Sequence, residues 1–376
     1  GIYLAETDGV AIGASTTTAG DLNVVAGGAV TTSGNITAAG GALGVTGVGL
    51  TNTNTITGDL NGIVLDAGTG TLTSTAGSIS NGSSAGAISL AADTAVSING
   101  GAGSIAAGTG DVTIKDSSGS ISIGVVGGTG TIQVATADLN EITTTGKIII
   151  GDASSGAVTI GGAVTAPGSA GLQFGGSSVA LNAGVTTSSG AISFVPAVTI
   201  GADLIVTSGA GAGDITFSGT IDGGNALTLT GGTGNVALAG ITGGITQLSA
   251  LTITGSDVSI SDIGDSDTVG VSGATSATAT DDLTLSGSTY KTNAATFAAA
   301  AGDKILLTKG SAITFTTTDD AVAFNTGNIK LSDGSDFSVT SAGGAISAVA
   351  IYGTSSEDFT LSSTGGTTNT VSVGTV

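Results

Sequence analysis

Carboxylates are the side chains in this chain most able to do chemistry. The 376 residues carry 27 Asp and Glu but no His, and the acidic stretch SDVSISDIGDSDTVG gathers four of them. These are Asp257, Asp262, Asp265 and Asp267. Closely spaced carboxylate oxygens are the ligands that Ca²⁺ prefers, so the spacing is compatible with a calcium site. The EF-hand pattern and the glycine-rich calcium nonapeptide are both absent. Two interpretations therefore stay open: a calcium site at these residues, and turn carboxylates that contact only water.

The absence of His, Cys and Arg removes most other chemistry. It excludes Ser-His-Asp and Cys-His nucleophiles, zinc sites of the His/Cys kind and arginine clamps on phosphate. Two Ser–Lys pairs, Lys115 with Ser117 and Lys309 with Ser311, are interpreted as surface residues. We expect no enzyme and no cofactor other than calcium. A polysaccharide-cleaving β-helix that uses paired carboxylates is a minor alternative, which the lack of Trp and Arg disfavours.

The charge balance limits the partners. A formal net charge of −21 disfavours nucleic acid, which requires clustered Lys and Arg against its phosphates. The same charge disfavours binding to anionic lipid. No apolar run approaches the ~18 residues of a spanning helix, so we expect no membrane insertion.

Short alternating segments recur along the whole chain. GDLNV, GDVTI, GDITF and DDLTL each place an Asp or small residue before an apolar–polar–apolar triplet. Alternation of this kind is typical of a strand with one buried face. The Asp in the lead-in is interpreted as turn chemistry. The Ala-rich segment from Asn293 to Leu307 is also predicted to be strand, and no stretch shows convincing helix periodicity.

Strands this short, with glycine at the corners and few aromatics, favour a β-solenoid over a sandwich or barrel. Three strand segments per coil would give coils of ~20–25 residues. We predict a three-faced parallel β-helix rod, a single continuous β-solenoid over residues 1–376, which could be part of a longer repetitive chain.

The segment SGAISFVPAVTIGADLIVTSGAGAGDITFSGTIDGGNALTLTGGTGNVALAG, from Ser189 to Gly240, resembles the repetitive β-strand regions of large bacterial surface proteins. These are the filamentous-haemagglutinin-like adhesins and the autotransporter passenger domains. The resemblance implies a right-handed coil, secretion, and a role as stalk, adhesin or surface filament. Two family features, the Asn-Pro secretion signature and the C-terminal membrane barrel, are missing, which leaves the export route open.

These observations predict a structural protein outside the cell or on its surface, as a subunit or segment of a filament, sheath or stalk. We expect end-to-end self-association, because the ends of a solenoid carry unpaired backbone groups. The alternative is an adhesin that binds a glycan or another cell-surface partner.

Overall fold

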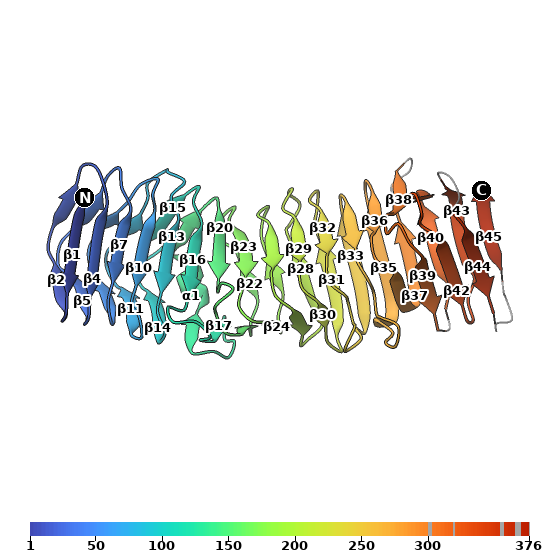
Figure 1. Cartoon of the computed structure of the whole chain (residues 1–376), viewed down its shortest axis with the longest axis horizontal. Coiled ribbons are helices and arrows are strands. Elements are labelled where there is room, and N and C mark those ends of the chain that lie inside the picture. The colour runs from blue at the N-terminus through green and yellow to red at the C-terminus, as the bar shows by residue number, and fades with distance from the viewer. Residues whose placement is uncertain (300–302, 319, 354–356, 365–369, 376) are drawn as a thin grey trace. The chain divides into compact units, whose positions relative to one another are not determined.

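The chain folds almost entirely into parallel β-strands. A computed structural model describes residues 1–299, 303–318, 320–353, 357–364 and 370–375, and forms a parallel β-solenoid of about 16 turns (Figure 1). This confirms the predicted fold class; the handedness stays a prediction. The chain divides into two compact units, unit 1 (Gly1–Pro196) and unit 2 (Ala197–Val376).

Unit 1 begins with coils of three strands that belong to three parallel sheets. The first sheet contains β1 (Ile2–Glu6), β4 (Leu22–Ala26), β7 (Leu43–Thr46), β10 (Ile63–Asp66), β13 (Ile88–Ala91), β16 (Val112–Lys115), β20 (Lys147–Ile150), β23 (Gly171–Phe174) and β26 (Ile192–Phe194). The second contains β2 (Val10–Ile12), β5 (Val30–Thr32), β8 (Leu50–Asn52), β11 (Thr71–Ser74) and β14 (Ala95–Ile98). The third contains β3 (Ser15–Thr17), β6 (Ile36–Ala38), β9 (Ile56–Thr57), β12 (Ile79–Ser80), β15 (Ile105–Gly108) and β19 (Ile142–Thr144). The later coils add β17 (Ile123–Val125), β18 (Ile132–Val134), β21 (Val158–Ile160), β22 (Val164–Thr165), β24 (Val179–Leu181) and β25 (Val185–Thr186).

The register explains the sequence pattern. Leu22 pairs with Leu43, Leu43 with Ile63, and Ile63 with Ile88, at separations of 20 to 25 residues. All four side chains are at most 1% exposed. Because alternate side chains of a strand point to one face, the apolar residue of each triplet lies over its counterpart in the next coil. The expected coil length is confirmed here.

One coil of unit 1 is longer than the rest. Val112 pairs with Ile148, 36 residues further on, and the extra chain holds β17, β18 and the short helix α1 (Thr136–Asn140). The sequence pattern did not predict α1, because five residues are too few to show a helical period. The carboxylate of Asp138 accepts a hydrogen bond from the Ala135 N–H at 2.7 Å, and burial raises the pKa of this side chain.

Unit 2 has longer strands and several that span two faces. Its first face contains β29 (Ile215–Phe217), β32 (Val236–Leu238), β34 (Val258–Ile260), β36 (Leu283–Leu285), β38 (Lys304–Leu307) and β41 (Asn328–Leu331). The other faces contain β27 (Val198–Ile200), β28 (Leu204–Thr207), β30 (Ile221–Asp222), β31 (Ala226–Thr230), β33 (Ala250–Gly255), β35 (Val271–Ala279), β37 (Thr289–Ala298), β39 (Ile313–Thr317), β40 (Val322–Thr326), β42 (Phe337–Ser341), β43 (Ile346–Tyr352), β44 (Phe359–Ser363) and β45 (Val371–Thr375). The segment Asn293–Leu307 is strand in β37 and β38, as predicted, while its residues 300–302 lie outside the described residues.

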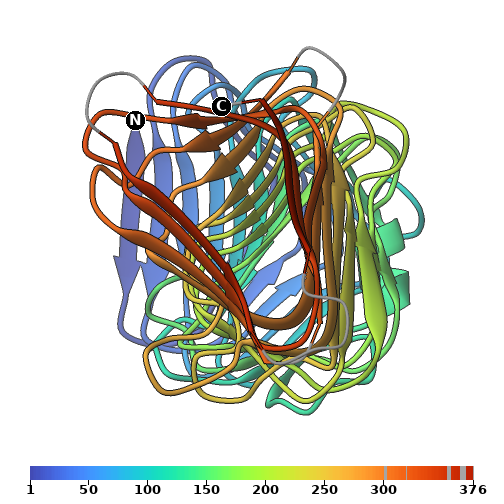
Figure 2. The ribbon, with the colours of Figure 1, turned by 90° about the vertical axis from the view of Figure 1, so that its right-hand side faces the viewer.

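The interior of unit 2 contains an aromatic cluster. Figure 2 shows its coils end on, with the orange and red strands around a common interior. Phe315 lies at the centre of the cluster, with its ring centroid 4.4 Å from Tyr290 and 5.3 to 5.7 Å from the other three rings. The cluster consists of Tyr290, Phe297, Phe315, Phe324 and Phe337. Burial raises the pKa of Tyr290, and its hydroxyl donates a hydrogen bond to the Ile260 carbonyl at 3.0 Å.

Candidate functional site

An Asp or Asn precedes four first-face strands of unit 2 (β29, β32, β34 and β36), and its side chain bonds to the next coil. The Asp214 carboxylate accepts from the Asn235 N–H at 2.8 Å, and the Asn235 side-chain oxygen accepts from the Asp257 N–H at 3.0 Å. Asp257 in turn accepts from the Asp282 N–H, and Asp282 from the Lys304 N–H, at 3.2 and 3.1 Å. We call this series the Asx ladder. It satisfies backbone donors at the starts of the strands, where the chain turns a corner.

Unit 1 uses the same arrangement. The Asp21 carboxylate accepts from the Ala42 N–H at 2.8 Å, and Asp111 accepts from the Lys147 N–H at 2.7 Å. The sequence analysis interpreted these aspartates as turn chemistry. The structure adds that each carboxylate joins two successive coils.

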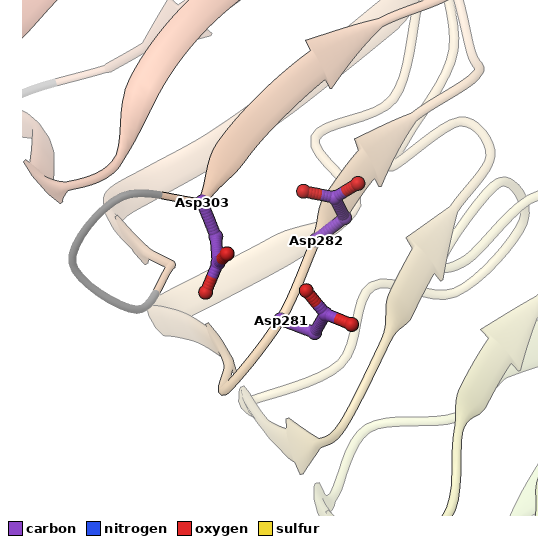
Figure 3. A group of neighbouring side chains, drawn as sticks. All are labelled: Asp281, Asp282 and Asp303. Atoms are coloured by element: carbon purple, nitrogen blue, oxygen red, sulfur yellow. The ribbon is translucent and has the colours of Figure 1, made fainter.

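Three carboxylates of unit 2 lie close together at this edge. Asp281 and Asp282 precede β36 and Asp303 precedes β38, and one carboxylate oxygen of each lies within 4.8 Å of the others (Figure 3). The negative charges of Asp257 and Asp303, followed by desolvation and Asp282, raise the pKa of Asp281. The group is exposed or half-buried. Three oxygens are part of the set that Ca²⁺ takes, which is 6–8 ligands. This acidic group therefore does not settle whether calcium binds.

Of the four aspartates predicted from the sequence, three accept hydrogen bonds from different backbone N–H groups. Asp257 belongs to the Asx ladder, and Asp262 accepts from the Ser288 and Thr289 N–H groups at 2.7 and 2.8 Å. Asp265 accepts from the N–H groups of Asp267 and Thr268.

The hydrogen bonds from Asp267 and then Thr268 hold the pKa of Asp265 below its ordinary value, while Asp267 itself is exposed. Within the described part of the chain, Asp257, Asp262, Asp265 and Asp267 do not form a group of three or more with carboxylate oxygens within 4.8 Å of one another. Calcium at these residues stays a prediction.

The Lys of the first Ser–Lys pair has a different partner. Lys115 forms a 2.8 Å ion pair with Asp152, the residue that follows β20 by two positions. Partial burial raises the pKa of Asp152, but hydrogen bonds from Lys115 and Ser154 outweigh it and hold the pKa well below the ordinary value. Lys309 and Ser311 are both exposed.

The ion pair lines a groove on the outer face of the first sheet of unit 1. The groove has a volume of about 630 Å³ and crosses strands β13, β16, β20 and β23. It lies at the carboxyl ends of these strands, where Lys115 ends β16 and Gly175 follows β23. The sequence analysis did not anticipate it, because residues as far apart as Thr113 and Gln173 meet there only when the coils stack.

The comparisons with known proteins add nothing to this geometry. No family model matches the chain, and no curated protein or solved structure matches it. Among the described residues, no helix is long and apolar enough to cross a membrane.

Proposed function

We propose that the chain is a structural protein of the cell surface, a subunit or segment of a filament, sheath or stalk. One observation supports this most: coil after coil, both apolar and polar side chains are used to hold the next coil. The apolar residues stack in register, and the Asx ladder joins the strand starts. Each repeat of a solenoid is stabilised mainly by its neighbours. Further coils can therefore be added along the axis, and each one lengthens the molecule.

Self-association end to end is part of the proposal. Strand β1 pairs with β4 on one side, and no other strand of the described residues pairs with its second edge. On this strand Ile2 and Leu4 are 47% and 37% exposed, whereas the Leu22 and Val24 side chains that pair with them are buried.

In the last coil, Phe359 and Val371 are 40% and 47% exposed. A second copy that places its last coil against β1 would cover apolar surface at both ends. It would also pair the free backbone groups of β1. Such head-to-tail contact is heterologous and extends into filaments.

Sedimentation velocity of the full chain over a hundredfold concentration range, together with electron microscopy, tests the proposal. We expect end-to-end polymers that grow with concentration and that the variant carrying Ile2→Lys and Leu4→Lys does not form. Leu60→Lys is the matched control, since Leu60 is 70% exposed and lies outside β1. Monomers at every concentration, or loss of assembly in the Leu60 variant as well, would contradict end-to-end assembly.

A further inference from the structure

The groove of unit 1 is fixed by its backbone. Gly175 follows β23, and a Cβ atom there would lie 2.6 Å from the Gly151 carbonyl oxygen, a distance that real Cβ atoms essentially never show. Gly151 has φ of +73° and Gly176 has φ of +90°, the left-handed region that favours glycine. Residues with a side chain are therefore disfavoured at these three positions, and none of the three contributes a side chain to the groove.

Two polar side chains in the groove have unused hydrogen-bonding capacity. Thr113, Ile149 and Gln173 are in register on β16, β20 and β23, and all three are half-buried on the outer face. Within the described residues, neither the Thr113 hydroxyl nor the Gln173 amide forms a hydrogen bond. They differ in this from the Asx ladder, in which one side-chain oxygen of each residue accepts a hydrogen bond from the next coil. A side-chain amide offers both donors and acceptors, which suits a ligand rich in hydroxyl groups.

The charges at the groove cancel. Lys115 is the one cation among the lining residues, and its ammonium group is paired with Asp152 at 2.8 Å. The surrounding chain is strongly acidic, with a formal net charge of −21. An anionic ligand would be repelled by this field, whereas an uncharged one would not.

Apolar surface completes the lining. Val195 is 47% exposed, and Ile149 and Pro196 also line the groove. These side chains can cover the C–H face of a sugar ring while the free polar groups bond to its hydroxyls. The volume of about 630 Å³ falls within the ~300–1,000 Å³ that is usual for small-ligand sites.

We propose that this groove binds a neutral oligosaccharide. The chain of the sugar would lie across strands β13 to β26, with Gln173 and Thr113 bonding to its hydroxyls. An extended peptide fits less well, because a peptide commonly docks by adding a strand to a sheet edge. The groove lies on a sheet face, where the backbone groups of β16, β20 and β23 already pair with one another.

A printed array of neutral oligosaccharides, acidic oligosaccharides and peptides, probed with the labelled full chain, tests the proposal. We expect binding to neutral oligosaccharides, and titration of the strongest one then measures the effect of variants. Gln173→Ala should weaken binding about five- to tenfold, the effect of one lost hydrogen bond. Val195→Arg should weaken it further by filling the groove.

The matched control is Thr159→Ala, a half-buried outward-facing residue of β21 that does not line the groove. It should bind as the wild type does, and circular dichroism verifies the fold of each variant. The proposal is overturned if no neutral oligosaccharide binds, if only acidic glycans or peptides bind, or if both groove variants bind like the control. Any of these results leaves the structural role untouched.

Discussion

The interiors of the two units are built differently. At one corner of unit 1, Thr32, Asn52 and Ser74 stack in three successive coils. The Thr32 hydroxyl donates to the Asn52 side-chain oxygen at 2.7 Å, and the Asn52 amide donates to Ser74 at 3.1 Å. Unit 2 has the aromatic cluster around Phe315 instead. Its strands β35 and β37 have 9 and 10 residues, against at most five for any strand of unit 1. The five rings of the cluster are at most 1% exposed and pack against one another in the interior of the unit.

The units also differ in how their buried hydroxyls are satisfied. The polar stack of unit 1 is hydrogen-bonded from coil to coil. In unit 2 the buried hydroxyls of Thr242, Thr275 and Thr292 have no partner within the described residues. A hydrogen-bonded polar stack fixes which coil lies over which, whereas an aromatic cluster supplies mainly apolar contact.

The largest expected effect is loss of the central ring of unit 2. Phe315→Ala should lower the free energy of unfolding by about 3–5 kcal/mol, since it removes contacts to four rings and leaves a cavity. Urea denaturation followed by circular dichroism measures this. Phe359→Ala is the control, because this ring is 40% exposed and should change stability by less than ~1 kcal/mol. Equal losses in both variants would show that the cluster does not hold unit 2 together.

The polar stack of unit 1 should be sensitive to partial removal. Asn52→Ala should cost about 2–3 kcal/mol, because it leaves the buried Thr32 and Ser74 hydroxyls without this partner. Replacing all three residues together, by Thr32→Val, Asn52→Leu and Ser74→Ala, should cost less than the single change. Additive losses in the same denaturation assay would contradict a coupled stack.

Replacing an unpartnered buried threonine of unit 2 should change the free energy of unfolding by less, and in the opposite direction. Thr292→Val should stabilise the protein by about 1 kcal/mol, because it replaces an unpartnered buried hydroxyl by a methyl of the same shape. Thr317→Val is the matched control: its hydroxyl donates to the Asp320 carbonyl at 2.6 Å, so this variant should be less stable than the wild type. Stabilisation of both variants, or of neither, would show that the presence of a hydrogen-bond partner does not decide the effect of removing the hydroxyl.

The smallest effects are expected from two carboxylates with opposite pKa shifts, the half-buried Asp152 and the exposed Asp281. Asp152 has a lowered pKa in the folded state, so its stabilisation is present above the ordinary Asp value of ~3.9 and is lost as the pH falls through its folded pKa. Asp152→Asn should therefore reduce the melting temperature at pH 7, and the difference should shrink below about pH 4.

For Asp281 the sign is reversed. The pKa is raised in the folded state, first by the charge of Asp257, so repulsion is absent below the ordinary pKa and appears as the pH rises through the folded pKa. Asp281→Asn should raise the melting temperature at pH 7 and leave it unchanged near pH 3. A pH-independent change in either variant would show that charge is not its cause.

The fold could be predicted from the sequence because its pattern is local. GDVTI predicts from its local alternation alone that Val112 and Ile114 are buried, as they are in β16. The features of the candidate site could not be predicted from the sequence, because they depend on which residues of successive coils lie over one another. Asp303 lies in the coil after that of Asp282, and it joins the acidic group only through the pairing of β36 with β38.

The predicted aspartates were chosen because they are close in sequence. Asp257 and Asp262 flank β34, a three-residue strand, so their side chains lie at opposite ends of it and serve different corners. The long coil with α1 was missed for a related reason: an insertion between β16 and β20 leaves the flanking strand patterns unchanged. Coil spacing, rather than sequence proximity, is therefore the signal that would find such sites.

Single-molecule force spectroscopy on the full chain, held at its two ends, tests most directly the claim that each coil is held by its neighbours. The account predicts a series of unfolding steps, each releasing about one coil, or roughly 7 nm for ~21 residues at ~3.5 Å per residue. Release of nearly the whole chain in one step, on the order of 130 nm at the same length per residue, would contradict coil-by-coil stabilisation.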